Sequence, residues 1–500
     1  MNTLTPHQMR TDDFALILAA EECQPDAFDE IHKFSDHDRR LIRKLVAHGP
    51  VLLQGGRGTG KSAFMIAASR EMAPHNPDSS VLGLYISLRY VPLLQATGQD
   101  YEMQFCTWVS RQIQKTLAGQ SYNFEDSKDI RLLKNNLTEL TKTTNKRVVL
   151  LFDDAAHIGR ETSLASFFDI FRTLSSETIS CKAAIYPGVT EFGTRFDVYN
   201  DASVIDVVRS PEQAGFTQLF YNIMTSRYPV LTNERVTGFT LHSLAGFLGR
   251  TVLGNVRGFV FACNDLLERA ESGDTIGYNL LGDTLIRLAA DYYWPLLDEV
   301  KPKLGRYVPA VDAAQQVAEV IFQACASNTS QSVLIHRQIV ARYSKSFEIL
   351  EYAGFIARRE ASRALKSGGR GPRFSINLCN LLERISGSRL TSSLFDSWSE
   401  GSGAPTEIHE RGVLFDAIDI PHPNDSEDME ILGMQIDILE KSKSYPYGLT
   451  RNKINSLKEA NIITVGDLAN SSDESLLAID GVGDVFLDRF RSVVGQAIWM

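Results

Sequence analysis

Hydrophobic residues in the first two hundred positions fall into short continuous runs separated by longer amphipathic stretches. Continuous apolar runs of four to eight residues are typical of strands buried on both faces of a parallel sheet. Between the runs, residues 105–117 and 130–144 have helical periodicity, and Ser35 is placed to cap a helix through His48. Strands alternating with helices predict a doubly wound α/β core over residues 35–210. The predicted strands are 51–53, 81–88, 148–152, 181–186 and 203–208.

The pattern changes after this core. Residues 211–326 read as helices without a convincing strand, which predicts an all-α lid. In residues 327–390, two short helices precede a hairpin with strands at 354–360 and 373–377. The remaining predicted segments are a polar N-terminal extension (1–34), a mostly flexible acidic linker rich in Ser, Gly, Pro, Asp and Glu (391–445), and a compact helical unit (446–500).

Composition narrows the class of protein. The chain has 500 residues, 43% of them hydrophobic, and a net charge of −10, so we expect several cores and no overall coat of positive charge. Its six cysteines are scattered without a C-x-x-C pair, which indicates a reduced environment. No apolar run approaches the roughly 20 residues of a membrane helix, and the N-terminus lacks a signal-peptide core. We therefore expect a cytoplasmic protein that does not enter membranes.

The strongest local motif follows the first predicted strand. Gly55 to Ser62 fits G-x-x-x-x-G-K-[ST], the phosphate-binding P-loop, between a strand and a good helix former. Its glycines let backbone N–H groups converge on an anion, and the helix N-terminus adds positive potential. Lys61 is placed to reach the β- and γ-phosphates and Ser62 to ligate Mg²⁺. The predicted ATP-binding residues here are Gly55, Gly56, Arg57, Gly58, Thr59, Gly60, Lys61, Ser62 and Ala63.

Two acids and an arginine could complete such a site. Asp153 and Asp154 end the strand 148–152, where the first could hold Mg²⁺ beside Ser62 and the second could activate water. The alternative is that both acids only terminate the strand. Arg257 opens a predicted helix, a position that the helix dipole disfavours. It is either simply exposed or turned back toward nucleotide phosphates, which its planar fork suits.

The P-loop, the strand ending in Asp153-Asp154 and the segment Gly254-Asn255-Val256-Arg257 together resemble AAA+ ATPases, most closely the origin-recognition (replication-initiator) branch. The resemblance covers about residues 30–380 and implies an ATPase core, a helical lid and a winged helix. It implies that Arg257 senses the γ-phosphate, that Thr190 is the polar sensor after the fourth strand, and that Arg195 is an arginine finger for a neighbouring subunit of an oligomer. The family carries Asp-Glu where this chain has Asp153-Asp154, so we expect slow hydrolysis.

The hairpin carries a second candidate chemistry. It is strongly basic in a chain that is acidic overall, and its glycine-tipped loop looks like the wing of a winged-helix domain. Such a wing contacts DNA phosphates, and the helix before it can enter the major groove. The alternative is a solvated loop or a protein contact. The predicted DNA-binding residues are Arg358, Arg359, Arg363, Lys366, Arg370 and Arg373, against the single acid Glu360.

The C-terminal unit resembles a helix-hairpin-helix domain such as that of the RNA polymerase α subunit. Gly481 and Gly483 would let a phosphate approach the backbone at a helix N-terminus. Asp480, Asp484 and Asp488 flank the same turn and would repel DNA. The unit therefore predicts either DNA binding or docking of a partner protein.

Two functions fit these observations. The first is an ATP-hydrolysing protein that binds DNA through the winged helix under nucleotide control. The second is a nucleotide-gated switch that holds ATP, turns it over slowly and recruits a partner effector through the C-terminal unit, in defence against phage or mobile elements. ATP turnover with and without duplex DNA separates them.

Overall fold

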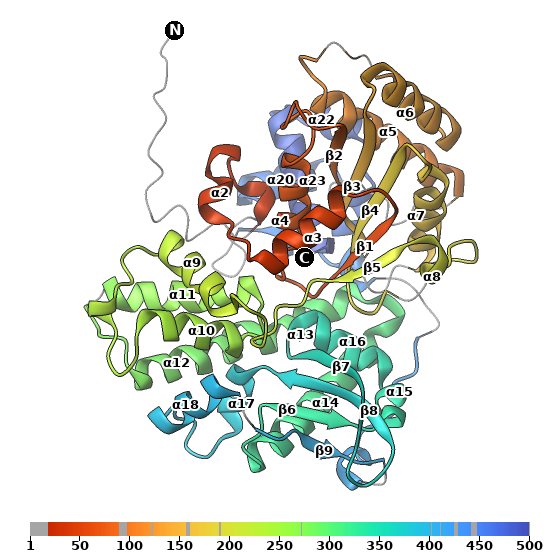
Figure 1. The fold of residues 1–500 in the computed structure, drawn as a ribbon. Coiled ribbons are helices and arrows are strands. Elements are labelled where there is room, and N and C mark those ends of the chain that lie inside the picture. The colour runs from red at the N-terminus through yellow and green to blue at the C-terminus, as the bar shows by residue number, and fades with distance from the viewer. Residues whose placement is uncertain are drawn as a thin grey trace.

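A five-stranded parallel sheet forms the centre of the N-terminal half of the chain (Figure 1). Its order is β2-β3-β4-β1-β5, so β4 lies between the P-loop strand β1 and the acid-bearing strand β3. The strands are β1 (Val51–Gln54), β2 (Val81–Ser87), β3 (Arg147–Ala156), β4 (Ile179–Ile185) and β5 (Ser203–Asp206). The computed structural model describes residues 19–89, 98–120, 122, 124–156, 161–189, 192–271, 273–401, 403–410, 412–424, 429–441 and 448–499.

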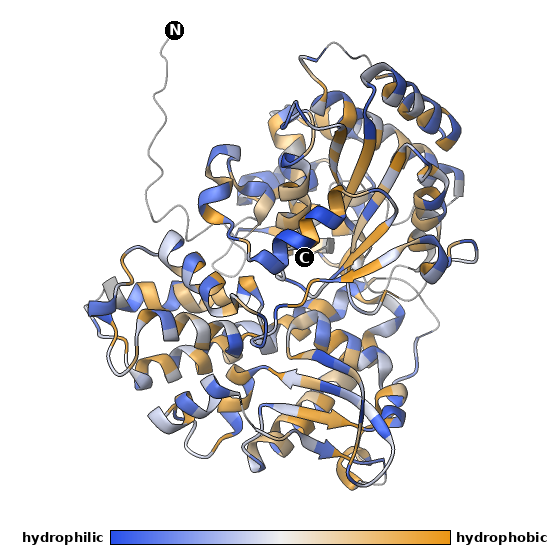
Figure 2. Ribbon diagram, viewed as in Figure 1, coloured by the Kyte–Doolittle hydropathy of each residue, from blue (hydrophilic) through white to orange (hydrophobic). Residues whose placement is uncertain are grey.

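Helices cover both faces of this sheet because its strands are apolar on both sides. Leu52 and Leu150 pack toward one layer and Leu53 and Val149 toward the other. Figure 2 shows hydrophobic residues concentrated on the central strands. One layer is α3 (Asp36–Val46), capped by Ser35, with α4 (Lys61–Arg70); the other is α5 (Gly98–Thr116), α6 (Ile130–Thr144) and α7 (Glu161–Leu174).

The lid is helical, as the sequence predicts. It follows β5 and packs beside the P-loop end of the sheet (Figure 1). Its helices are α9 (Phe216–Arg227), α10 (Leu241–Thr251), α11 (Val256–Glu271), α12 (Tyr278–Leu288) and α13 (Trp294–Val300), with a π-helical turn at Ala289–Tyr293.

Helix α14 (Val308–Ser327), which the sequence places in the lid, lies where the lid meets the predicted winged-helix unit. It packs on the lid helix α13 and also on α16 (Ser344–Ala353) and α17 (Leu378–Arg384) of that unit. The unit comprises β6 (Ser332–Ile335), α15 (Arg337–Arg342), α16, the wing strands β7 (Ile356–Ala364) and β8 (Arg370–Ile376), and α17.

The prediction of a mostly flexible linker over 391–445 is wrong for its first part. Helix α18 (Ser392–Glu400) packs on α10, burying Phe395 to 4% and Trp398 to 1% exposure. Strand β9 (Thr406–Ile408) then pairs in parallel with β6, giving the sheet order β7-β8-β6-β9. Two large aromatic side chains three residues apart supply the burial that the polar composition conceals.

The C-terminal helices form a unit with its own core. That core starts near Met429, inside the predicted linker, and continues to Ala497. Its helices are α19 (Glu430–Gly433), α20 (Arg451–Glu459), α21 (Val465–Asn470), α22 (Asp473–Leu477) and α23 (Asp484–Trp499). Among the helices that the structure describes, none is both long and apolar enough to cross a membrane.

Candidate nucleotide-binding site

The P-loop connects β1 to α4 as the motif predicts. Gly58 and Gly60 have φ angles of 81° and 92°, a conformation that glycine adopts without strain. A Cβ on Gly58 would also lie 2.6 Å from Arg257 Cβ and from Asn255 Oδ1. The P-loop is therefore packed directly against the first turn of α11 in the lid.

Lys61 is buried in this loop at 6% exposure. Its ammonium donates to the carbonyl oxygens of Gly55 (2.8 Å) and Gly56 (3.2 Å), and it lies 3.6 Å from the centre of the Tyr186 ring. Burial lowers its pKa to about 7, against the attraction of Asp154 and Asp153. Phosphate oxygens would replace the carbonyls as acceptors and favour the charged form.

Asp153 and Asp154 lie at the carboxyl end of β3, beside the P-loop helix. Asp153 Oδ1 accepts from the backbone N–H of Asp154 (3.0 Å), and the Ser62 side chain also hydrogen-bonds Asp153. Burial raises the pKa of Asp153, and burial with the charge of Asp153 raises that of Asp154 to about 7. Asp154 has a φ of 51°, a left-handed backbone conformation that few residues other than glycine adopt.

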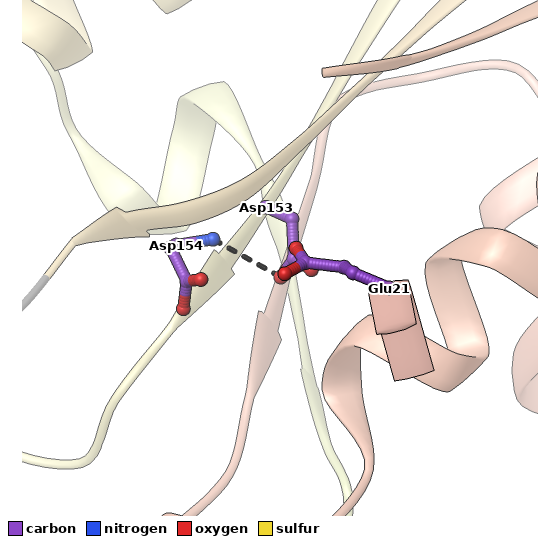
Figure 3. Close-up of side chains that lie close together, drawn as sticks. All are labelled: Glu21, Asp153 and Asp154. Carbon is purple, nitrogen blue, oxygen red and sulfur yellow. Dashed lines mark hydrogen bonds between the residues drawn. The ribbon is translucent and has the colours of Figure 1, made fainter. Parts of the chain in front are cut away.

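A third acid, Glu21, reaches this point from the N-terminal segment. Carboxylate oxygens of Glu21, Asp153 and Asp154 lie within 4.8 Å of one another, and Figure 3 shows them converging. The Tyr85 hydroxyl lies 2.7 Å from both Glu21 Oε1 and Asp153 Oδ2, and Arg89 Nη1 lies 3.1 Å from Glu21 Oε2. These hard oxygen donors beside Ser62 fit a magnesium ion. The sequence did not predict Glu21, which lies in an extension without a motif.

A cavity of about 120 Å³ opens beside these groups. Polar groups line one part of it, among them Lys61, Ser62, Asp154 and Arg257. The backbone N–H of Arg257 donates to the Gly58 carbonyl (3.2 Å), which fixes the lid arginine at the phosphate end. Another part is lined by Ile31, His32, Phe34, Ile223 and Val260, which would suit a planar base.

Arg209, which the sequence analysis does not predict, holds the P-loop backbone through a hydrogen bond. It is 6% exposed, follows β5 and lines the same cavity. Its Nη1 donates to the Thr59 carbonyl (2.7 Å), and its Nε lies 3.2 Å from Asp38 Oδ1. Such a buried pair orients the P-loop backbone.

Two further residues are predicted to act on the nucleotide, Thr190 and Arg195. Thr190 falls outside the described residues; Tyr186, directly after β4, is the residue that contacts Lys61. Arg195 lies on the surface with its side chain 70% exposed, 3.9 Å from Asp169, and it does not line the cavity. That placement leaves its proposed role toward a neighbouring subunit as a prediction.

The wing brings together most, but not all, of the predicted DNA-binding residues. Arg358, Arg363, Lys366 and Arg370 are exposed on the hairpin, whereas Arg359 donates to the Arg209 carbonyl (3.3 Å) and to Ser375 (3.1 Å). Glu351 pairs with Arg358, and Glu360 with Arg363 and Arg373.

The helix before the wing, which the sequence analysis expects can enter a major groove, is largely covered in this structure. Of the ten residues of α16, all of them described, only Ser344 is exposed. The helix lies between the winged-helix core and the ATPase core, where its apolar residues are covered.

The sheet order, P-loop, acid-bearing strand and helical lid define an α/β P-loop fold of the AAA+ type, with a winged helix and a small C-terminal helical unit, and confirm the predicted fold class. No family model and no curated protein matches the chain. A Walker-type ATPase of Pyrococcus abyssi is 12% identical (TM-score 0.42), with 76% of this chain and 100% of that chain covered. The ORC2 protein of Aeropyrum pernix is 10% identical (TM-score 0.41; 75% and 98% covered).

The ORC1 protein of Aeropyrum pernix, solved in complex with DNA, is 13% identical (TM-score 0.33; 76% and 95% covered). TM-scores below 0.5 do not by themselves establish a common fold. The fold class therefore rests on this chain's own strand order and site.

Proposed function

We propose that the protein binds Mg-ATP, hydrolyses it slowly and binds duplex DNA through its winged helix under nucleotide control. The observation that supports this most directly is the convergence of Lys61, Ser62, Asp154 and Arg257 on one cavity, with Asp153 hydrogen-bonded to Ser62. These groups come from the P-loop, β3 and the lid. They supply a cation for phosphates, oxygen ligands for the metal, a carboxylate base and a lid arginine.

Each residue has a distinct role in this proposal. Ser62 and Asp153 would hold Mg²⁺, which neutralises charge on the phosphate oxygens. Lys61 and Arg257 bind the β- and γ-phosphates, and Asp154 accepts a proton from the attacking water. Asp154 is shorter than a glutamate, and burial raises its pKa to about 7. A base that is partly protonated near neutral pH is consistent with slow turnover.

DNA binding is proposed from the charge of the wing. Six basic residues and one acid lie between positions 356 and 373 of a chain whose net charge is −10. Four of the six are exposed on the hairpin. Contacts from such a wing would go to phosphates, so binding should depend strongly on salt and little on sequence.

The testing experiment is ATP turnover measured with and without duplex DNA, for the wild type and Lys61→Ala. The proposal expects slow turnover that DNA increases and Lys61→Ala removes. Turnover that survives Lys61→Ala would refute the site. Tight ATP retention with no response to DNA would favour the second function, a switch that recruits a partner protein through the C-terminal unit.

A further inference from the structure

The P-loop and the winged helix are in direct contact. The backbone N–H of Arg57 donates to the Tyr352 carbonyl at the end of α16 (2.9 Å). A Cβ on Gly56 would lie 2.8 Å from the Glu351 carbonyl oxygen, so the two backbones approach as closely as glycine permits. The last turn of α16 thus rests on the loop that would hold the phosphates.

The side chains of Arg57 and Asn255 connect this part of the P-loop to the lid. The guanidinium of Arg57 pairs with both carboxylate oxygens of Glu299 on α13 (3.2 and 3.4 Å), and Asn255 Nδ2 donates to the Arg57 carbonyl (2.6 Å). Although burial opposes it, the pKa of Glu299 stays below its ordinary value because Arg57 and Lys303 lie beside it. Arg57 therefore joins the P-loop to both the lid and the winged helix.

A second set of contacts, through two aromatic rings, connects Lys61 to α16. The Lys61 ammonium lies over the Tyr186 ring, and Tyr186 meets Tyr352 edge to face with ring centres 4.9 Å apart. At the other end of α16, Lys345 donates to the Gly188 carbonyl (3.0 Å). Any movement of Lys61 toward phosphates therefore disturbs a ring that packs on α16.

This docking adds to the burial of α16, which α14 and β7 already cover in part. The helix precedes the wing, the position from which a winged helix reads a DNA groove, yet nine of its ten residues are at least partly buried. The contacts at Arg57, Tyr186 and Gly188 account for the side facing the ATPase core. The wing itself stays exposed.

We propose that α16 is held against the P-loop in an autoinhibited arrangement, that Arg57 and Glu299 form its latch, and that binding of nucleotide phosphates releases the helix toward DNA. This inference rests on the proposed function, and it names the contact through which the nucleotide would control DNA binding. Lys61 must leave the Gly55 and Gly56 carbonyls to reach phosphates, and this changes the loop segment whose next residue, Arg57, donates to the Tyr352 carbonyl on α16. Because coupling between binding sites is reciprocal, DNA should tighten nucleotide binding by the factor by which nucleotide tightens DNA binding.

The test uses Glu299→Gln in the full chain, which removes the latch charge without altering the P-loop. The matched control is Lys303→Gln, which removes the other cation that pairs with Glu299 (2.9 Å). Affinity for a short duplex is measured without nucleotide and with ATP analogue and Mg²⁺. We expect Glu299→Gln to bind nucleotide-free DNA at least about 5-fold more tightly than the wild type, the low end for coupled sites. Lys303→Gln should stay within about 2-fold of the wild type.

Hydrogen exchange of the α16 amides provides a readout without DNA. In the wild type, ATP analogue should increase exchange over residues 344–353, Lys61→Ala should abolish the increase, and Glu299→Gln should show fast exchange from the start. Equal protection of α16 in all three proteins and both nucleotide states would overturn the inference. If exchange responds as expected but neither the wild type nor a variant binds DNA, the latch is supported and the proposed DNA-binding function is refuted. A thermal unfolding midpoint near that of the wild type shows that Glu299→Gln is folded.

Discussion

Removal of the exposed wing cations should change how DNA binding depends on salt. Arg363, Lys366 and Arg370 lie near the tip of the hairpin and are exposed. Arg363 pairs with Glu360 at 3.3 Å, but its side chain remains 48% exposed and such pairs are weak. The triple substitution of these residues by Gln leaves the strands and their apolar face unchanged.

The expected magnitude follows from counterion release. Each phosphate contact contributes about 0.9 to the slope of log affinity against log salt. Loss of three contacts should make the slope shallower by about 2.7. A fourfold increase in salt, from about 50 to 200 mM, should then weaken wild-type binding about 40-fold more than binding by the triple variant. Fluorescence anisotropy with a labelled duplex at several salt concentrations measures both slopes.

The control variant changes the same formal charge elsewhere. Lys115, Lys128 and Arg131 are exposed around α5 and α6, far from the wing in sequence. Their substitution by Gln should leave the slope equal to that of the wild type. Equal slopes for the wing variant and the wild type would refute wing binding to phosphates. An equal decrease in both variants would show that net charge, rather than the wing, determines affinity.

Three further outcomes follow from buried groups. Asp154→Asn should reduce turnover by about 10²-fold or more while nucleotide binding persists, because Asn tolerates the same left-handed backbone; unchanged phosphate release would exclude Asp154 as the base. Burial, aided by Arg227, lowers the pKa of His32 to about 4, so the unfolded chain binds a proton that the folded chain excludes between about pH 6.5 and 4. Acidification from about pH 7.5 to 5 should therefore cost on the order of 2 kcal/mol of unfolding free energy, and His32→Phe should remove this loss in denaturant titrations. Trp398→Ala should destabilise the main core by about 3–5 kcal/mol; a change below about 1 kcal/mol would show that α18 is not docked.

The central sheet and the P-loop could be predicted because their chemistry is local. A buried parallel strand is a continuous apolar run, and the glycines around Lys61 lie within one turn of chain. The same logic predicts Asp153, the first acid after such a run. The segment that opens its helix predicts a role for Arg257, and Arg257 does line the cavity.

Glu21, Tyr186 and Arg209 could not be found this way because their roles depend on contacts far apart in sequence. Glu21 meets Asp153 only after β2 and β3 have paired and the N-terminal segment has folded back across them. Arg209 acquires its role from Asp38 and Thr59. No local pattern distinguishes these residues from ordinary surface charges.

The linker predicted from the polar composition of residues 391–445 is wrong in its first part for a related reason. A docked helix is distinguished here from a linker by Phe395 and Trp398. These two side chains are buried because they pack against aromatic rings of the lid, such as Phe247 on α10. Similarly, the pattern of a winged helix gives α16 an apolar face but does not say whether the opposite face is covered. That depends on how the unit packs on the P-loop.

The two glycines of the P-loop that contact other units show why Glu299 is the informative residue. Gly56 permits the approach of the Glu351 carbonyl, and Gly58 that of Arg257. The same glycines would also let the loop curl around phosphates. A substitution at either position would thus disturb phosphate binding and domain docking together, and loss of activity could not separate the two. Glu299 touches the loop only through the Arg57 side chain among its described contacts, so its substitution tests docking while the phosphate-binding backbone remains intact.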